Sequence, residues 1–509
     1  MRQGESLSAH SSPDKADVYS QPDVVSASAW TREKRQQMKE MKRDLRTSGA
    51  VGQLLRVTSR ASNGLASTDK PTCEDFCNPM TLRQRWKMVS AVLRRCVWMS
   101  AALLCCTFPA HVYADVPVNF AEKKAWLKSV EEADYLYWRR VVDRLELKDE
   151  WAPPASWYVP QVAIEGGEMG YFPAAKTIPA SMQAAVQAAW DYALSRNSKA
   201  LLIVHKGRST AERYAPGYHR GSLLNARSMT KTLTAMLFGL AIEDGAVDSL
   251  DDPINRYIKE WENDPRGEIS LRTYLRNASG LEFPTTADPG SKVSKLINGT
   301  HVNNVALSFA LDPDLEGRFL QNNANTQVLG IALQRAVGAS FHSYLSRKIW
   351  QPIGASLALM KQDRIGGETV TYCCLRSTAA SWARIGQVFL TRGFTNTGEQ
   401  VLPTGWVREM LMPSPANANY GQHIWRGTPY TAKRSYAPVF AWASVNSHSE
   451  PFLAKDLFYL DGGAKTRVWI IPSRQLVIVR MGDRPRKGVE FDDAFIPNTI
   501  MRGLADEWP

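Results

Sequence analysis

Short apolar runs at two distant places in the chain constrain its fold most. Residues 200–205 (Ala-Leu-Leu-Ile-Val-His) form one run, and the Lys-Gly pair after it predicts a hairpin that returns through residues 209–214. Residues 467–471 and 475–480 form a second pair of strands around a Pro-Ser-Arg turn. Residues 250–370, between the two pairs, are predicted to be mostly helical. The pattern predicts an α+β fold, in which both chain ends form one antiparallel sheet and a helical subdomain is inserted.

Three further segments have the apolar periodicity of a helix. They are residues 120–148, 182–195 and 228–243, and the last of them ends at an Asp-Gly pair. The third helix follows the first strand hairpin closely, so its N-terminus is expected near the sheet. A pocket is expected between the sheet and the helical subdomain.

The first 114 residues have the order of an export signal, but far from the N-terminus. Residues 1–79 are rich in Ser, Gln and charged residues and are predicted to be disordered. Residues 80–114 run from a basic cluster through an apolar stretch to small residues, as a secretory signal does. The alternatives are a membrane anchor formed by residues 96–114, or a buried helix. We expect translation to start at Met80 or later, and the mature protein to be periplasmic or secreted.

The rest of the chain divides into a helical extension, residues 115–154, and a main domain, residues 155–509. The net charge of +12 is uneven, because the first 114 residues hold 17 basic and 10 acidic residues. The main domain mixes both signs, so a nucleic-acid partner is not expected.

Cysteine use excludes a scaffold built on disulfides. Of the seven cysteines, five lie before residue 115, and the adjacent pair Cys373-Cys374 remains. We expect these two thiols to pack side by side, with a disulfide in an oxidising compartment as the alternative. The segment after residue 115 has no metal-ligand spacing, so no metal is expected.

Ser228-Met-Thr-Lys231, at the start of the third helix, carries the candidate chemistry. A serine hydroxyl needs a base nearby, and the i, i+3 spacing places Ser228 and Lys231 on one helix face. The helix N-terminus would stabilise an oxyanion, and burial would keep Lys231 neutral. Ser-x-x-Lys is the nucleophile pattern of β-lactamases and penicillin-binding proteins. It also occurs by chance at residues 12–15 and 67–70, and a simple N-cap at Ser228 is the alternative.

Collinear blocks surround this motif, at residues 226–232, 239–245, 249–254, 275–281, 325–330 and 420–425. In this order they resemble the class C β-lactamase-related serine hydrolases, and within them the 6-aminohexanoate-dimer hydrolase branch. The resemblance covers about residues 155–505. It implies a β-lactamase/transpeptidase-like fold and acyl transfer through a covalent serine ester. It implies neither a metal nor an organic cofactor.

The second motif of that family is altered here. The family has Tyr, any residue, then Asn or Ser, whereas this chain has Gln321 at the tyrosine position and Asn323 as the polar partner. An amide cannot shuttle a proton as a phenol does, so another group must take that role. Lys231 itself, a water, or a tyrosine such as Tyr372 or Tyr420 are the candidates.

The third motif, Lys-Thr-Gly or His-x-Gly in the family, is altered too. Gly463 stands at the Lys or His position, Ala464 follows, and Lys465 stands at the Gly position. A one-residue bulge would restore Lys465 as an anchor for an acidic substrate group, with a backbone N–H nearby completing the oxyanion hole. The alternative is a glycine-rich strand start with a solvent-facing lysine. Like the two tyrosines, His423 and Trp425 are candidates for lining the cleft.

Two functions stay open at this point. The first is an exported serine hydrolase that cleaves a small amide or ester, with Ser228 as nucleophile and Lys231 as general base. The second is a protein that keeps the fold but binds a ligand or a cell-wall fragment without turnover, as the two altered motifs suggest. Neither function implies nucleic acid or a membrane span in the mature chain, and the oligomeric state is not predicted.

Overall fold

The computed structural model describes residues 135–141, 143–144, 153–167, 170–283, 288 and 290–504. They lie in Asp115–Pro509, one of two units into which the chain divides. The expectations for residues 1–114 fall outside the described residues and stay predictions. Of the helix predicted at 120–148, residues 135–141 and 143–144 are described, and all of them are helical.

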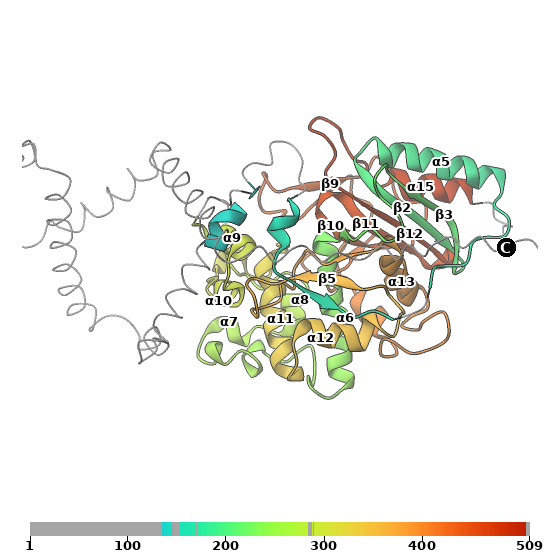
Figure 1. Cartoon of the computed structure of the whole chain (residues 1–509). Coiled ribbons are helices and arrows are strands. Elements are labelled where there is room, and N and C mark those ends of the chain that lie inside the picture. Colours follow the sequence, from blue (N-terminus) through green and yellow to red (C-terminus); the bar gives the residue numbers. More distant parts are fainter. Residues whose placement is uncertain are drawn as a thin grey trace, which may run out of the picture. The chain divides into compact units, whose positions relative to one another are not determined.

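A six-stranded antiparallel sheet organises the described part of the chain (Figure 1). Its order is β3-β2-β12-β11-β10-β7, so two early strands lie beside four late ones. The strands are β2 (Ser198–His205), β3 (Arg208–Tyr214), β7 (Trp425–Arg426), β10 (Phe458–Gly462), β11 (Thr466–Ile471) and β12 (Leu476–Gly482). The two chain ends join where β2 pairs with β12, with Ile203 opposite Ile478. The predicted antiparallel sheet from both chain ends is therefore confirmed.

Both faces of this sheet are covered, which explains why its central strands are apolar throughout. On β2, Leu201 and Ile203 face a core shared with α5 (Ala180–Leu194) and α15 (Phe495–Gly503), whereas Leu202 and Val204 face the larger core. Helices α5 and α15 lie side by side in Figure 1. Helix α13 (Ala379–Leu390) packs on the other face, against β11 and β12.

Most of the remaining helices lie between β3 and β7 along the chain, as predicted for the inserted subdomain. They are α6 (Thr230–Glu243), α7 (Pro265–Glu268), α8 (Leu271–Leu275), α9 (Lys292–Asn298), α10 (Val302–Leu307), α11 (Asn323–Val337), α12 (Phe341–Leu345) and α14 (Trp406–Met410). Short helical turns are η3 (Ala155–Tyr158), η5 (Ile254–Arg256), η6 (Lys259–Trp261), η7 (Pro313–Leu315), η8 (Ser346–Trp350) and η10 (Pro472–Arg474). Within the described ranges, none of the helices has the length and hydropathy that crossing a bilayer requires.

Two small sheets were not predicted, because strands of two to four residues carry too little periodicity. One has the order β1-β5-β6-β4, and the other pairs β8 with β9. Their strands are β1 (Gln161–Ile164), β4 (Leu224–Asn225), β5 (Ala358–Lys361), β6 (Arg376–Ser377), β8 (Lys433–Ser435) and β9 (Val445–Ser447). Strand β4 leads into the segment that carries Ser228, so the first of these sheets positions the candidate nucleophile.

The cysteine pair also differs from expectation. Cys373 and Cys374 are joined by a disulfide rather than packed as two thiols. Cys374 has a left-handed backbone, with φ of 77°, and this conformation leaves no periodic signal in the sequence.

Candidate active site

Ser228 lies in a single helical turn, η4 (Arg227–Met229), which leads directly into α6. The serine therefore stands two residues before the start of the α-helix rather than at its first position. Arg227 before it has a left-handed φ of 54°. This conformation costs an L-residue free energy, which contacts with the surroundings must offset. Backbone bonds fix the turn: the N–H of Arg227 donates to the Asn225 side chain over 2.8 Å, and the N–H of Ala226 donates to the carbonyl of Leu375 over 2.9 Å.

Lys231 lies in the first turn of α6 and is only 2% exposed. Its Nζ donates to Oδ1 of Asn323 over 2.8 Å and lies 3.4 Å from Oγ1 of Thr326. Burial lowers the pKa of Lys231 to about 7, because the charged ammonium loses its hydration. A large fraction of this amine is therefore neutral near pH 7 and able to accept a proton.

One cavity of about 460 Å³ brings together the three predicted motifs. Ser228, Lys231, Gln321, Asn323, Gly463, Ala464 and Lys465 all line it. The remaining lining residues were not predicted, because they belong to none of the three motifs. They are Phe283, Tyr436, Trp442, Ala443, Ser444, Val445, Asn446, Asp461, Gly462, Arg484 and Pro485.

Tyr436 supplies a phenol to this cavity beside the altered second motif. The backbone N–H of Gln321 donates to the Tyr436 carbonyl over 2.8 Å, so the two residues are neighbours. The Tyr436 hydroxyl is 3.0 Å from Nδ2 of Asn446. Burial raises the pKa of Tyr436 well above its ordinary value, and the nearby Asp461 carboxylate adds to this effect. The phenol therefore stays protonated, and its hydroxyl donates to Oδ1 of Asn446 over 3.2 Å.

The third-motif residues form a turn rather than part of a strand. They make up η9 (Gly463–Lys465) between β10 and β11, and Ala464 and Lys465 have left-handed φ values of 61° and 62°. The Nζ of Lys465 donates to Oδ1 of Asn446 over 2.8 Å and lies 3.3 Å from Oδ2 of Asp493. The lysine is thus held within the protein and does not extend freely into solvent.

The other four predicted lining residues are buried and do not line the cavity, which corrects that prediction. Tyr372, Tyr420, His423 and Trp425 are each at most 3% exposed and are absent from the cavity wall. The Tyr372 hydroxyl donates to the Leu296 carbonyl over 2.8 Å. The Tyr420 hydroxyl accepts from Asn277 over 2.9 Å.

His423 nevertheless supports the lysine indirectly. Its Nε2 is 3.2 Å from Oγ1 of Thr326, the hydroxyl that also contacts Lys231. Burial, and the charge of Lys231, lower the pKa of His423 well below its ordinary value. A neutral imidazole therefore completes the polar surroundings of the amine. Among the described residues, no three His, Cys, Asp or Glu side chains are grouped so as to hold a metal ion.

Gly462, at the end of β10, allows the sheet to meet the nucleophile turn closely. A Cβ at this position would lie 2.5 Å from the Ala226 carbonyl oxygen and 2.1 Å from Oγ1 of Thr466. We expect Gly462→Ala to displace the turn and to slow acylation of Ser228 by about 10²-fold, the size of effect that a shift of about 1 Å produces. The measurement is the rate of labelling by a fluorophosphonate, followed as the adduct on the peptide that contains Ser228.

Gly463 is the matched control, since it lines the same cavity and a Cβ there would have no atom within 4 Å. Gly463→Ala should label close to the wild-type rate. Equal labelling of both variants would contradict the close-contact argument.

This fold, in which Ser228 and the buried Lys231 line one cavity, is of the β-lactamase/transpeptidase-like class. The comparison with known families agrees. The family model described as Beta-lactamase matches residues 182–496, so the chain belongs to the beta-lactamase family.

Individual proteins are similar to this chain at low sequence identity. A 6-aminohexanoate-dimer hydrolase of Paenarthrobacter ureafaciens is 24% identical over 231 residues, which are 42% of this chain and 56% of the relative's length. A solved structure of a candidate 6-aminohexanoate-dimer hydrolase of Bacillus anthracis has a TM-score of 0.51 and 20% identity, covering 64% of this chain and 86% of the other. A class C β-lactamase of Rhodobacter sphaeroides has a TM-score of 0.45 and 15% identity, covering 64% and 98%.

Proposed function

We propose that this protein cleaves an amide or ester through a covalent acyl intermediate on Ser228. The observation that carries the proposal is Lys231, a buried amine with a pKa near 7 that lines the same cavity as the serine. A structural lysine gains nothing from such burial, whereas a general base near its working pH does.

The geometry supports a two-step reaction. Neutral Lys231 takes the proton of the Ser228 hydroxyl as the oxygen attacks the substrate carbonyl carbon. The ammonium so formed then gives this proton to the leaving amine or alcohol. Asn323, which accepts a hydrogen bond from Lys231 Nζ, keeps the amine in place. In the second step water attacks the acyl-serine, with Lys231 again as base, and the free serine is restored.

Tyr436 takes the place of the missing family phenol in this scheme, as a neutral donor that orients the leaving group. We expect Tyr436→Phe to lower acylation by about 10-fold, in line with loss of one positioned hydrogen bond. The measurement is the acylation rate constant with an amide substrate. Tyr459→Phe is the control, because that phenol is fully buried and its hydroxyl lies 3.3 Å from Nη1 of Arg434, outside the cavity wall. An unchanged rate in Tyr436→Phe would show that this phenol does not orient the leaving group.

Short amide oligomers and esters of apolar acids are the substrate classes that this cavity suits best. Phe283 and Trp442 line it, and their rings lie 5.9 Å apart, so one wall offers aromatic surface to a methylene chain. The relative from Paenarthrobacter ureafaciens is a hydrolase of 6-aminohexanoate dimer, a substrate of this type.

A substrate panel with mass spectrometry tests the proposal. The full chain is mixed with 6-aminohexanoate dimer, short p-nitrophenyl esters and a penicillin, and both product release and adduct mass are followed. Turnover with an acyl adduct on the Ser228 peptide supports the hydrolase. A folded protein that binds these compounds and yields no adduct would favour binding without turnover.

We also propose that the protein is exported. The basic-then-apolar order of residues 80–114 supports this, and so does a disulfide at Cys373–Cys374, since disulfides persist mainly outside reducing compartments.

A further inference from the structure

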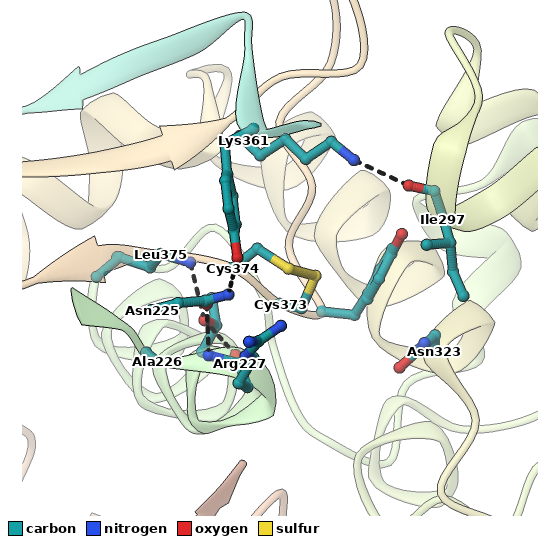
Figure 2. The surroundings of a disulfide bond; sticks show 12 residues. Asn225, Ala226, Arg227, Ile297, Asn323, Lys361, Cys373, Cys374 and Leu375 are labelled. Carbon is teal, nitrogen blue, oxygen red and sulfur yellow. Dashed lines mark hydrogen bonds between the residues drawn. A yellow bond between two sulfur atoms is a disulfide. The ribbon is translucent and has the colours of Figure 1, made fainter. Parts of the chain in front are cut away.

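A backbone ladder ties Cys374 to the turn that carries the nucleophile. The N–H of Cys374 donates to the Arg227 carbonyl over 3.2 Å, and the N–H of Ala226 donates to the Leu375 carbonyl over 2.9 Å. Figure 2 shows the disulfide beside this ladder. Arg227, directly before Ser228, and Cys374 both have left-handed φ values, of 54° and 77°. The hydrogen bond from Cys374 to Arg227 therefore joins two residues whose left-handed backbone conformations each cost free energy.

The residues just before the disulfide contact the surroundings of the base. The Tyr372 ring centroid lies 5.3 Å from Nζ of Lys231. The Thr371 hydroxyl donates to the backbone carbonyl of Thr326 over 3.0 Å, and Thr326 in turn contacts Lys231 through its own hydroxyl. The five residues 371–375 thus contact Lys231 through Tyr372 and contact the turn that carries Ser228 through Cys374 and Leu375.

The disulfide itself is partly accessible. Cys374 is 4% exposed and packs with Trp157 and Tyr158, whereas Cys373 is only half-buried. A bond between neighbouring cysteines closes a small ring around their peptide, which restricts the φ and ψ angles that residue 374 can adopt. Its loss would let Cys374 leave the left-handed region, and the hydrogen bond to Arg227 would be lost with it.

We propose that the Cys373–Cys374 disulfide positions Ser228 for attack, so that its reduction slows acylation while the fold persists. The inference rests on the proposed serine-hydrolase function. The reductant is a dithiol: its two thiols give two electrons and two protons to the disulfide, Cys373 and Cys374 become thiols, and the dithiol closes to its cyclic disulfide. Both cysteines are positioning residues, because they act through the backbone of Arg227.

The test compares labelling of the full chain by a fluorophosphonate with and without dithiothreitol. Because the readout is the adduct on the Ser228 peptide, reaction of free thiols with the probe is not counted. We expect the maximal labelling rate to fall about 10- to 100-fold on reduction, with the probe concentration for half-maximal rate unchanged. Reoxidation should restore the rate, and a thermal melt should show that the reduced protein is folded.

Two double variants separate backbone positioning from packing. Cys373→Ser with Cys374→Ser should label as slowly as the reduced protein and should not respond to dithiothreitol, although its other five cysteines remain. Cys373→Ser with Cys374→Gly should recover much of the rate, since glycine adopts a φ of 77° without steric cost. A purely structural role would give no such rescue, because glycine fills less space than serine.

The outcomes distinguish this inference from the function on which it rests. Fast labelling of Ser228 in the reduced wild-type protein overturns the inference and leaves the hydrolase intact. A dithiol effect that persists in the double serine variant overturns it as well. No labelling of the oxidised protein contradicts the proposed function itself. If the double serine variant does not fold, the reduction and reoxidation of the wild-type chain still decide the question.

Discussion

Replacing Ser228 by alanine is expected to abolish both the covalent adduct and turnover. Every step of the proposed reaction passes through the Ser228 oxygen, so its removal leaves the proposed acyl intermediate without the atom that carries the acyl group. Loss of a nucleophile that acts together with its base lowers kcat by about 10⁴-fold or more. Intact-mass spectrometry after fluorophosphonate treatment, together with substrate hydrolysis, measures both effects.

Ser444→Ala is the matched control for this prediction. Ser444 lines the same cavity, so its removal changes the polarity of the wall but leaves the nucleophile in place. This variant should keep its adduct and most of its turnover. An adduct that survives in Ser228→Ala, or that maps to another residue, would remove the serine from the mechanism.

The nucleophile turn and the central sheet were predictable because their signals are local. Ser228 and Lys231 are three positions apart, and a helix of good periodicity fixes their relation. The central strands are continuous apolar runs, since both faces of the sheet are covered by helices. The position of the second motif was also predictable, because its polar residue Asn323 accepts a hydrogen bond from Lys231 as a site residue should.

The rest of the cavity could not be predicted because distant contacts create it. Tyr436 and Trp442 belong to the region around β8 and β9, where short strands and loops carry no periodic pattern. The disulfide joins Cys373 to Cys374, and the left-handed backbone at Cys374 leaves no periodic signal in the sequence. His423 and Trp425 have side chains typical of a cleft wall, but the fold buries both and neither lines the cavity.

Lys231→Met should lower the acylation rate by about 10²- to 10⁴-fold, the range for loss of a positioned general base. Methionine fills a similar volume without an ionisable group, so the surroundings of the amine change little in shape. In the wild-type protein the base must be neutral, and burial sets its pKa at about 7. The labelling rate at low probe concentration should therefore be small below pH 6, rise with a midpoint near pH 7, and reach a plateau at higher pH.

Lys361→Met is the control that assigns this pH dependence to one amine. Lys361 is also a buried lysine whose pKa burial lowers, but its Nζ donates to the Ile297 carbonyl and the residue is absent from the cavity wall. Its replacement should leave both the rate and the midpoint near pH 7 unchanged, because proton transfer requires contact with the Ser228 hydroxyl rather than a lowered pKa alone. A midpoint that moves in Lys361→Met, or a midpoint near pH 7 that persists in Lys231→Met, would show that another group titrates in the reaction. Lys231 would then be a structural amine, and a different group would activate Ser228.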